Sequence, residues 1–290
     1  MKILQYLTIA ACFLFGSCQN QERSNRLYEE GISLELAQLR KQEIKDLKYN
    51  LFFSIPEKKQ VPVEGEVKVS FTLQKPQEII IDFRETADKI KEVYVNGKSI
   101  EYQFLNEHII LPKASSIEGK NEVYIRFTAG DQSLNRNDEF MYTLLVPDRA
   151  RTVFPCFEQP NLKAEFTLQL EVPTEWEAVS NTSVESEAIK NERKHITFRP
   201  TEPLSTYLFS FVAGQLKKVE YADGERILTA YHRETDPKKI AQLDIIFQQV
   251  ASSLHWLEEY TDIPYPFAKY SFIILPGFQY GGMEHTGVVD

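Results

Sequence analysis

The sequence Val63-Glu-Gly-Glu-Val-Lys-Val-Ser-Phe-Thr-Leu73 alternates apolar and polar side chains, which is the two-residue period of a half-buried β-strand. Short runs of the same alternating or β-branched kind lie on both sides of it, at residues 49–55, 79–83, 93–95, 100–104, 108–111, 123–127, 164–172, 178–180, 195–198, 207–212 and 216–221. Asn96-Gly97 separates two of these runs and favours a tight hairpin, because both residues tolerate a positive φ. A short helix at 33–43 precedes the strands. Closely spaced strands without helices between them predict a β-sandwich or saddle-shaped sheet over residues 33–222.

The pattern changes after residue 222. A predicted strand at 226–232 is followed by Asp236-Pro237, a helix N-cap with proline at the first helical position. Apolar residues then recur at helical spacing as far as about Tyr260, and another predicted strand covers 270–275. We expect residues 223–290 to be the beginning of a second, mixed α and β domain. About seventy residues are marginal for a complete domain, so this one is predicted to be incomplete.

Composition and charge exclude two classes of protein. The chain has 290 residues, of which 42% are hydrophobic, so it is predicted to be globular and not disordered throughout. It carries 33 Lys and Arg against 42 Asp and Glu, a net charge of −9, without any basic block. Nucleic-acid binding, which relies on a basic face, is therefore not expected.

The N-terminus has the pattern of an export signal. Lys2 precedes an apolar run over residues 3–15, and Gly16-Ser17-Cys18 follows it. This pattern predicts a lipoprotein signal peptide at 1–17, lipidation of Cys18 and a polar tether over 18–32. The alternative is an ordinary signal peptide with an incidental cysteine. Both predict an exported protein, and the first anchors it to a membrane of the cell envelope through acyl chains.

The sequence contains no complete metal or nucleophile motif. None of the five histidines begins a His-Glu-x-x-His helix, and there is neither a phosphate-binding glycine loop nor a Gly-x-Ser-x-Gly elbow. His255 with Glu258 and Glu259 is more typical of a solvated charged turn than of a ligand pair. Cys156 has no cysteine near it, which favours a buried, inert thiol.

Two segments carry the strongest functional signal. The first is Arg151-Thr-Val-Phe-Pro-Cys-Phe-Glu-Gln-Pro-Asn-Leu-Lys-Ala-Glu-Phe166, which runs into a predicted strand. The second continues from Ile263-Pro-Tyr-Pro-Phe-Ala-Lys-Tyr270 through Leu275-Pro-Gly-Phe278 to Gly281-Gly-Met-Glu-His285. Together with Val212-Ala-Gly214 between them, they resemble the M1 family of zinc aminopeptidases over nearly the whole chain that follows the signal peptide.

The resemblance implies a fold that is mainly β. It consists of a saddle-like N-terminal β-sandwich domain and the truncated start, strand-helix-strand, of a thermolysin-like α+β catalytic domain. The implied activity is removal of N-terminal residues from peptides. A carboxylate can recognise a free α-ammonium through a charge-assisted hydrogen bond, and Glu284 is predicted in that role. Gly281, Gly282 and Met283 complete the predicted substrate-binding loop, because paired glycines let a substrate backbone come close.

The chain also departs from the family. His285 stands where the family usually has Asn, and residues 142–147 contain no counterpart of the family's second Glu or Gln anchor. In the family the zinc ligands and the transition-state tyrosine follow the Glu284 loop, beyond this sequence. The 290-residue chain is therefore predicted to have no catalytic residues or metal ligands of its own, and to neither bind catalytic zinc nor cleave aminoacyl substrates.

A second hypothesis belongs to another functional class. The chain could be a non-catalytic surface lipoprotein whose β-sandwich binds peptides or partners, with the partial second domain docked on it. A stable monomer would favour this hypothesis. An exposed core within residues 226–290, detected as aggregation or rapid proteolysis, would favour the aminopeptidase hypothesis.

Overall fold

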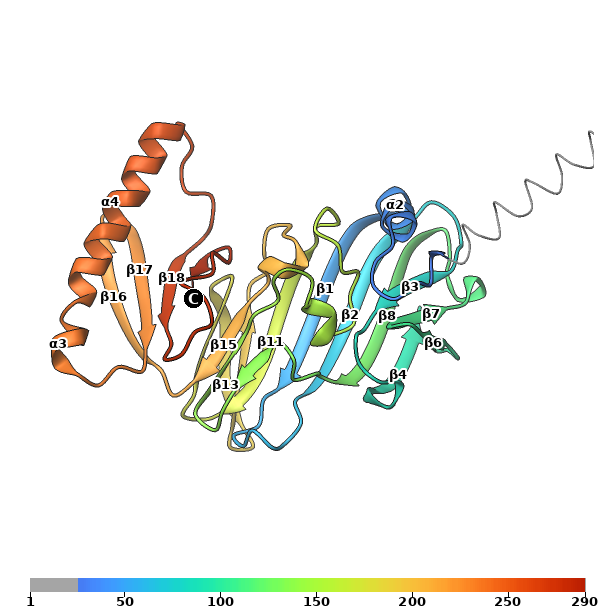
Figure 1. The fold of residues 1–290 in the computed structure, drawn as a ribbon, viewed down its shortest axis with the longest axis horizontal. Helices are drawn as coiled ribbons and strands as arrows, with labels where there is room; N and C mark the ends of the chain where they lie inside the picture. Colours follow the sequence, from blue (N-terminus) through green and yellow to red (C-terminus); the bar gives the residue numbers. More distant parts are fainter. Residues whose placement is uncertain (1–25, 290) are drawn as a thin grey trace, which may run out of the picture.

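The computed structural model describes residues 26–289. The predicted signal peptide, Cys18 and the first part of the predicted tether lie outside this range. Helix α2 (Leu34–Glu43) opens the described fold, and the Ser33 hydroxyl caps it by accepting a hydrogen bond from the Leu36 N–H. The helix predicted at 33–43 is confirmed. It leads directly into a long strand at the centre of the largest sheet (Figure 1).

The largest sheet has eight strands in the order β13-β14-β11-β1-β2-β8-β4-β5. Their bounds are β1 (Ile44–Ser54), β2 (Glu64–Leu73), β4 (Ile90–Val95), β5 (Lys98–Ser99), β8 (Gly119–Thr128), β11 (Glu165–Pro173), β13 (Val184–Lys190) and β14 (Arg193–Phe198). Neighbouring strands are antiparallel except for β1 and β11, which are parallel. β2 alternates exposed or half-buried side chains with buried ones, as its sequence predicts. The Asn96-Gly97 hairpin between β4 and β5 is confirmed, with a positive φ at both residues.

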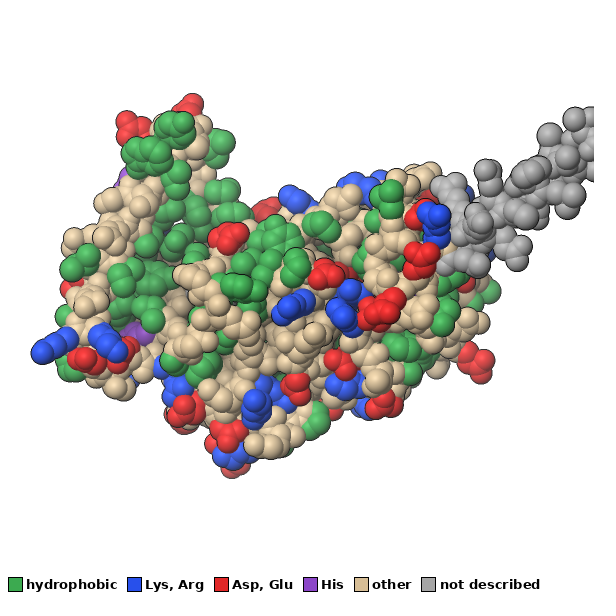
Figure 2. Space-filling view, in the orientation of Figure 1, with side chains coloured by type: hydrophobic (Ala, Val, Ile, Leu, Met, Phe, Trp, Pro, Cys, Tyr) green, Lys and Arg blue, Asp and Glu red, His purple; other side chains and the backbone are tan. Residues whose placement is uncertain are grey.

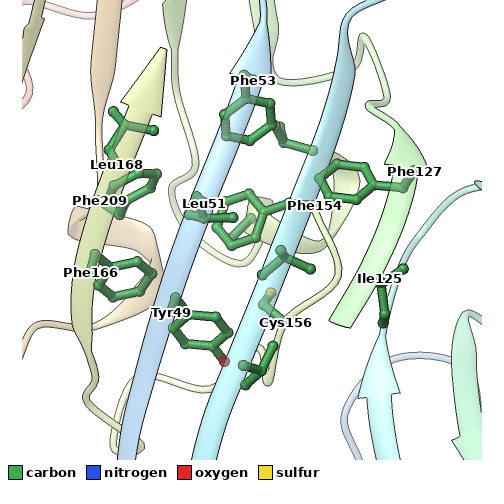
Figure 3. Packing of buried hydrophobic residues seen from close by; sticks show 14 of the residues in the cluster. Tyr49, Leu51, Phe53, Ile125, Phe127, Phe154, Cys156, Phe166, Leu168 and Phe209 are labelled. Atoms are coloured by element: carbon green, nitrogen blue, oxygen red, sulfur yellow. The ribbon is translucent and has the colours of Figure 1, made fainter. Parts of the chain in front are cut away.

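Two smaller sheets pack against the large one. The first has the order β12 (Glu177–Ser180), β15 (Phe211–Gly214), β10 (Phe140–Thr143) and β9 (Leu134–Arg136), and the second has the order β3 (Ile79–Asp82), β7 (His108–Leu111) and β6 (Gln103–Leu105). A single hydrophobic cluster takes side chains from all three sheets, including Phe53, Ile81 and Phe211. Figure 3 shows the aromatic rings of this cluster interdigitating around Tyr49 and Phe154. The predicted β-sandwich is confirmed.

Several element bounds differ from the sequence-based prediction. The patterns gave no strand for β9, β10 or β13, of which β13 is an edge strand with exposed side chains throughout. The strand predicted at 207–212 was wrong at its start, because a 3-10 helix occupies Thr206–Leu208 before β15 begins. Further 3-10 turns lie at Ala87–Lys89, Lys113–Ser115 and Ala150–Thr152.

The C-terminal part forms a separate sheet covered by a helix on one face. The strand order is β16 (Lys217–Asp223), β17 (Arg226–His232), β18 (Tyr270–Ile274) and β19 (Val288–Val289). Because β16 pairs with β17, this sheet begins before the domain boundary predicted between residues 222 and 223, and that boundary stays a prediction. Figure 1 shows α3 and α4 lying along this sheet, away from the sandwich.

The single helix predicted from Pro237 to about Tyr260 is two helices, α3 (Pro237–Ile240) and α4 (Leu243–Thr261). The Gln242 N–H bonds to the Lys239 carbonyl three residues back, so the chain tightens into a 3-10 turn there. The predicted Asp236 cap is confirmed, since its carboxylate accepts from the Lys238 N–H. No helix between residues 26 and 289 is long and apolar enough to span a membrane.

Candidate functional site: the loop of residues 275–287

The loop between β18 and β19 packs on the four-stranded sheet of the sandwich, β12-β15-β10-β9. Met283, which is 5% exposed, packs in a cluster with Phe140, Tyr142 and Val212 from that sheet. The Phe278 ring centroid is 5.3 Å from that of Tyr142. These contacts join the two parts of the chain, and Figure 1 shows the C-terminus close to their junction.

The loop alternates between buried and exposed side chains at its predicted site residues. Met283 and His285 are buried, whereas Gly281, Gly282 and Glu284 are exposed. A side-chain carbon added at Gly281 would meet no atom within 4 Å, so there is open space beside this residue. The Glu284 carboxylate is thus presented to solvent between two residues that fix the backbone. The substrate-binding roles of all four predicted loop residues stay predictions, and Met283 contributes packing in addition.

His285 is a neutral, buried side chain. It is 2% exposed, and this burial lowers the pKa of its imidazole from 6.5 to about 4. The ring is therefore uncharged near pH 7, as the amide of the Asn usual at this position would be. A neutral ring here leaves Glu284 as the charged side chain of the segment 281–286.

The stretch 142–147 lies beside the loop. Tyr142 and Leu144 belong to the cluster that buries Met283, and Val146 packs against it. These side chains are apolar or aromatic apart from Thr143, which is buried. The structure therefore brings the two segments together, but it places no second carboxylate or amide anchor from this stretch next to Glu284.

The other motif, around Phe-Pro-Cys-Phe, is part of the sandwich core. Cys156 is 0% exposed, and burial raises the pKa of its thiol well above the usual value, as expected for an inert thiol. Its backbone N–H and carbonyl pair with those of Asp82. Figure 3 shows Cys156 among the buried side chains beneath β1 and β2. This segment therefore closes the core and contributes nothing to the loop surface.

Two buried carboxylates hold this motif in place. Asp82 accepts hydrogen bonds from both terminal nitrogens of Arg40 at 2.7 and 2.6 Å and from the Glu158 N–H at 2.9 Å. His108 Nδ1 lies 2.8 Å from Asp82 Oδ1. Burial alone would raise the pKa of Asp82, but the Arg40 guanidinium and the His108 ring hold it below its usual range. The pKa of Glu158 is shifted in the opposite direction, because burial raises it from 4.5 to about 7.

The sequence analysis missed this cluster of Arg40, Asp82 and His108. One signal was present: Asp82 ends the apolar run Ile79-Ile-Ile81, where a lone charge indicates a buried partner. The cluster joins α2, β3, β7 and the segment around Cys156. The cluster is sealed in the core, so it is not a candidate site for substrate.

Zinc does not fit the side chains that the structure describes. Within residues 26–289, no three His, Cys, Asp or Glu side chains come close enough to hold a metal ion. His255 Nε2 lies 2.9 Å from Asp223 Oδ1, and the His255 side chain is 62% exposed, as expected for a solvated charged turn. The loop offers an exposed carboxylate and open space beside the Gly281 backbone.

The peptidase M1 N-terminal domain matches residues 45–208, which include most of the sandwich. The chain is similar to aminopeptidase N of Streptomyces lividans, with 30% identity over 219 residues, covering 70% of this chain and 25% of that protein. It is also similar to aminopeptidase M1-A of Oryza sativa subsp. japonica, with 36% identity over 149 residues, covering 51% of this chain and 16% of the relative.

A further relative, the leucyl aminopeptidase of Saccharolobus solfataricus, is 29% identical over 207 residues, covering 69% of this chain and 26% of that protein. The chain thus spans between 16% and 26% of the lengths of these three relatives. The domain match covers more than half of the chain and includes most of the sandwich on which the Glu284 loop packs. On this evidence the chain belongs to the peptidase M1 family, whose N-terminal domain it carries.

Proposed function

We propose that this chain is the N-terminal part of an exported metallo-aminopeptidase, and that the Glu284 loop receives the amino terminus of a peptide substrate. The observation that carries the proposal is the placement of Glu284. Its carboxylate is exposed, while Met283 and His285 on either side of it are buried against the body of the protein. The names of the relatives, which are aminopeptidases, support the same activity.

The loop has the chemistry that an exopeptidase needs at this position. A carboxylate that faces solvent can accept a charge-assisted hydrogen bond from a substrate α-ammonium. Gly281 and Gly282 are exposed and have no Cβ, so an extended peptide can approach the loop backbone. An N-acetylated peptide has no ammonium, so the loop would discriminate against it.

In this proposal the zinc of the family is held by residues that the 290-residue sequence does not contain. Zinc held by such residues would supply the Lewis acid for peptide hydrolysis. This chain's own contribution is to bind and orient the amino terminus. We expect the purified chain to release no free amino acid from aminoacyl substrates when zinc is added, and zinc-dependent release would contradict the proposal.

Membrane anchoring through Cys18 belongs to the same proposal and rests on the sequence pattern at residues 3–18. In cells that export and lipidate the protein, we expect the wild type to partition into the detergent phase and the Cys18→Ser variant into the aqueous phase. Detergent-phase partitioning of Cys18→Ser would contradict the lipid anchor. It would leave the role of Glu284 untouched.

The decisive experiment compares two peptides and two variants. The wild-type chain is titrated by NMR with trialanine and with N-acetyl-trialanine, and the same is done for Glu284→Gln. We expect the wild type to prefer the free amine and Glu284→Gln to lose about tenfold in affinity for it, as hydrogen bonds between charged groups are worth more than neutral ones.

Glu259→Gln is the matched control, because Glu259 is also exposed but lies on α4. This variant should bind trialanine as the wild type does. If the wild type binds both peptides equally, amino-terminus recognition by Glu284 is excluded, and the hypothesis of a non-catalytic surface lipoprotein that binds peptides or partners is favoured.

A further inference from the structure

Asn181 joins the sandwich to the segment that follows Glu284. It comes directly after β12 and is 5% exposed. Its amide nitrogen donates to the Thr286 carbonyl at 2.9 Å and lies 3.2 Å from the Thr286 hydroxyl. The same nitrogen donates to the Leu208 carbonyl, and its oxygen accepts from the Ser210 N–H. One buried side chain therefore ties β12 and the approach to β15 to a segment 105 residues away.

Gly287 completes the contact from the side of the loop. It has a φ of +74°, and a Cβ at this position would lie 2.2 Å from the Asn181 carbonyl oxygen. Only glycine fits here, both because of the left-handed backbone and because of the close backbone approach. The Gly287 carbonyl accepts from the Ser271 N–H at 3.2 Å and from Lys269 Nζ at 3.1 Å. The segment is thus held by the C-terminal sheet on one side and by the sandwich on the other.

From these contacts we infer that Asn181 and Gly287 form an interdomain clamp that positions Glu284 for amino-terminus recognition. This inference rests on the proposed function of Glu284. Asn181 is a positioning residue, since it is buried and acts on the substrate through Thr286. The clamp fixes the backbone two residues after Glu284, and Met283 fixes it one residue before. The sandwich thereby fixes the position of the Glu284 carboxylate, which belongs to the predicted second domain.

Polar groups that are buried or part-buried would lose a hydrogen-bond partner without the clamp. The Thr286 and Leu208 carbonyls and the Ser210 N–H all use Asn181 as a partner, and leaving such groups unpaired in the interior is costly. In Asn181→Asp, the Ser210 N–H keeps an acceptor, but a carboxylate oxygen faces the two carbonyls that lost their donor. This substitution therefore breaks the link to the loop with little change in side-chain volume.

The test uses two variants that break the clamp from opposite sides, Asn181→Asp and Gly287→Ala. Asn121→Asp is the matched control. Asn121 is 3% exposed, and its amide bonds to Ile117 and Gly119 within the sandwich. Hydrogen exchange of residues 279–289 is measured without peptide, and NMR titration gives the affinities for trialanine and N-acetyl-trialanine. Thermal unfolding of each full chain confirms that it is folded.

We expect both clamp variants to speed exchange in residues 279–289 by about tenfold and to lower the preference for the free amine by a similar factor, as the loss of one or two hydrogen bonds would produce. Asn121→Asp should change neither quantity, even if it lowers the unfolding temperature. If Asn181→Asp does not fold, Gly287→Ala decides alone.

Three other results would overturn the inference. Unchanged exchange in both clamp variants would show that the contact does not hold the loop. Faster exchange with an unchanged preference for the free amine would show a structural role only. Equal binding of both peptides by the wild type would refute the proposed function and the positioning role with it, while the exchange data would still report on the contact itself.

Discussion

Glu158 and Asp82 are buried carboxylates with opposite pKa shifts. Asp82 is surrounded by the guanidinium of Arg40 and the ring of His108, so its charged form is stabilised. Glu158 accepts hydrogen bonds from the Arg151 N–H at 2.8 Å and from the Thr206 hydroxyl, but these do not outweigh its burial. The difference shows that a cation in contact, more than a neutral donor, decides the charge of a carboxylate in this core.

The raised pKa of Glu158 predicts that the folded chain loses stability as the pH rises. The pKa of Glu158 is 4.5 in an ordinary environment and about 7 in the folded chain, so the folded state holds a proton that the unfolded state has lost. Glu158 contributes most to the free energy of unfolding below pH 4.5. This contribution falls by about 3 kcal/mol in total as the pH rises through 7. We expect Glu158→Gln to remove this dependence, as measured by urea unfolding between pH 5 and pH 8.

The difference between wild type and Glu158→Gln is the quantity to follow, because His285 contributes with the opposite sign. Its pKa is lowered to about 4, so its contribution to stability is lost as the pH falls from 6.5 through 4. Both effects are present in the wild type, but the His285 effect cancels in the difference. A difference that stays constant between pH 5 and pH 8 would contradict the shifted pKa of Glu158.

Gly65 in a strand and Gly97 in a turn are glycines for different reasons. Gly97, in the β4–β5 hairpin, has a φ of +78° but open space around it. Gly65, in β2, is not in the left-handed region, yet a Cβ there would lie 2.6 Å from the ring of Phe127 on β8. Phe127 is 0% exposed, so its ring is enclosed by the core.

We therefore expect Gly65→Ala to destabilise the chain more than Gly97→Ala. The hairpin substitution should cost about 1 kcal/mol from backbone strain. The strand substitution should cost about 1–3 kcal/mol because it overpacks the core. Urea unfolding measures both, and the double variant Gly65→Ala, Phe127→Leu should recover part of the loss. Equal costs for the two alanines would mean that β2 and β8 can move apart.

Helix α4 has a buried face towards its sheet and an exposed apolar face towards solvent. Phe247 and Leu254 pack on β17 and β18, whereas Trp256 is 59% exposed and Tyr260 is 75% exposed. The Trp256 and Tyr260 rings stack at 5.0 Å. Figure 2 shows hydrophobic side chains gathered near the end of α4 that lies farthest from α3. Such a patch favours self-association of the isolated chain.

We expect the double variant Trp256→Glu, Tyr260→Lys to lower self-association in sedimentation velocity while changing the unfolding free energy by less than about 0.5 kcal/mol. Phe247→Ala, on the buried face of the same helix, should cost about 3–5 kcal/mol. A wild-type chain that stays monomeric and resists proteolysis within residues 226–289 would contradict this prediction and favour the hypothesis of a non-catalytic surface lipoprotein.

Local sequence signals predicted many of the helices, strands and turns along the chain. The period of two in residues 63–73, the Asn96-Gly97 turn and the Asp236 cap are local signals, because they depend on neighbouring residues in the chain. They predicted the sandwich, the hairpin and the start of the second sheet. The motifs around Cys156 and Glu284 indicated the family. The strands β9, β10 and β13 escaped prediction because they are short or, in the case of β13, exposed on both faces.

Contacts between residues far apart in the sequence arise from tertiary packing. Arg40 reaches Asp82 across 42 residues, and Asn181 reaches Thr286 across 105. No periodicity encodes such pairs, because each polar group finds its partner only when packing removes water from around it. For the same reason the sequence could propose Glu284 as an anchor, but not that Met283, Asn181 and Gly287 hold it against the sandwich.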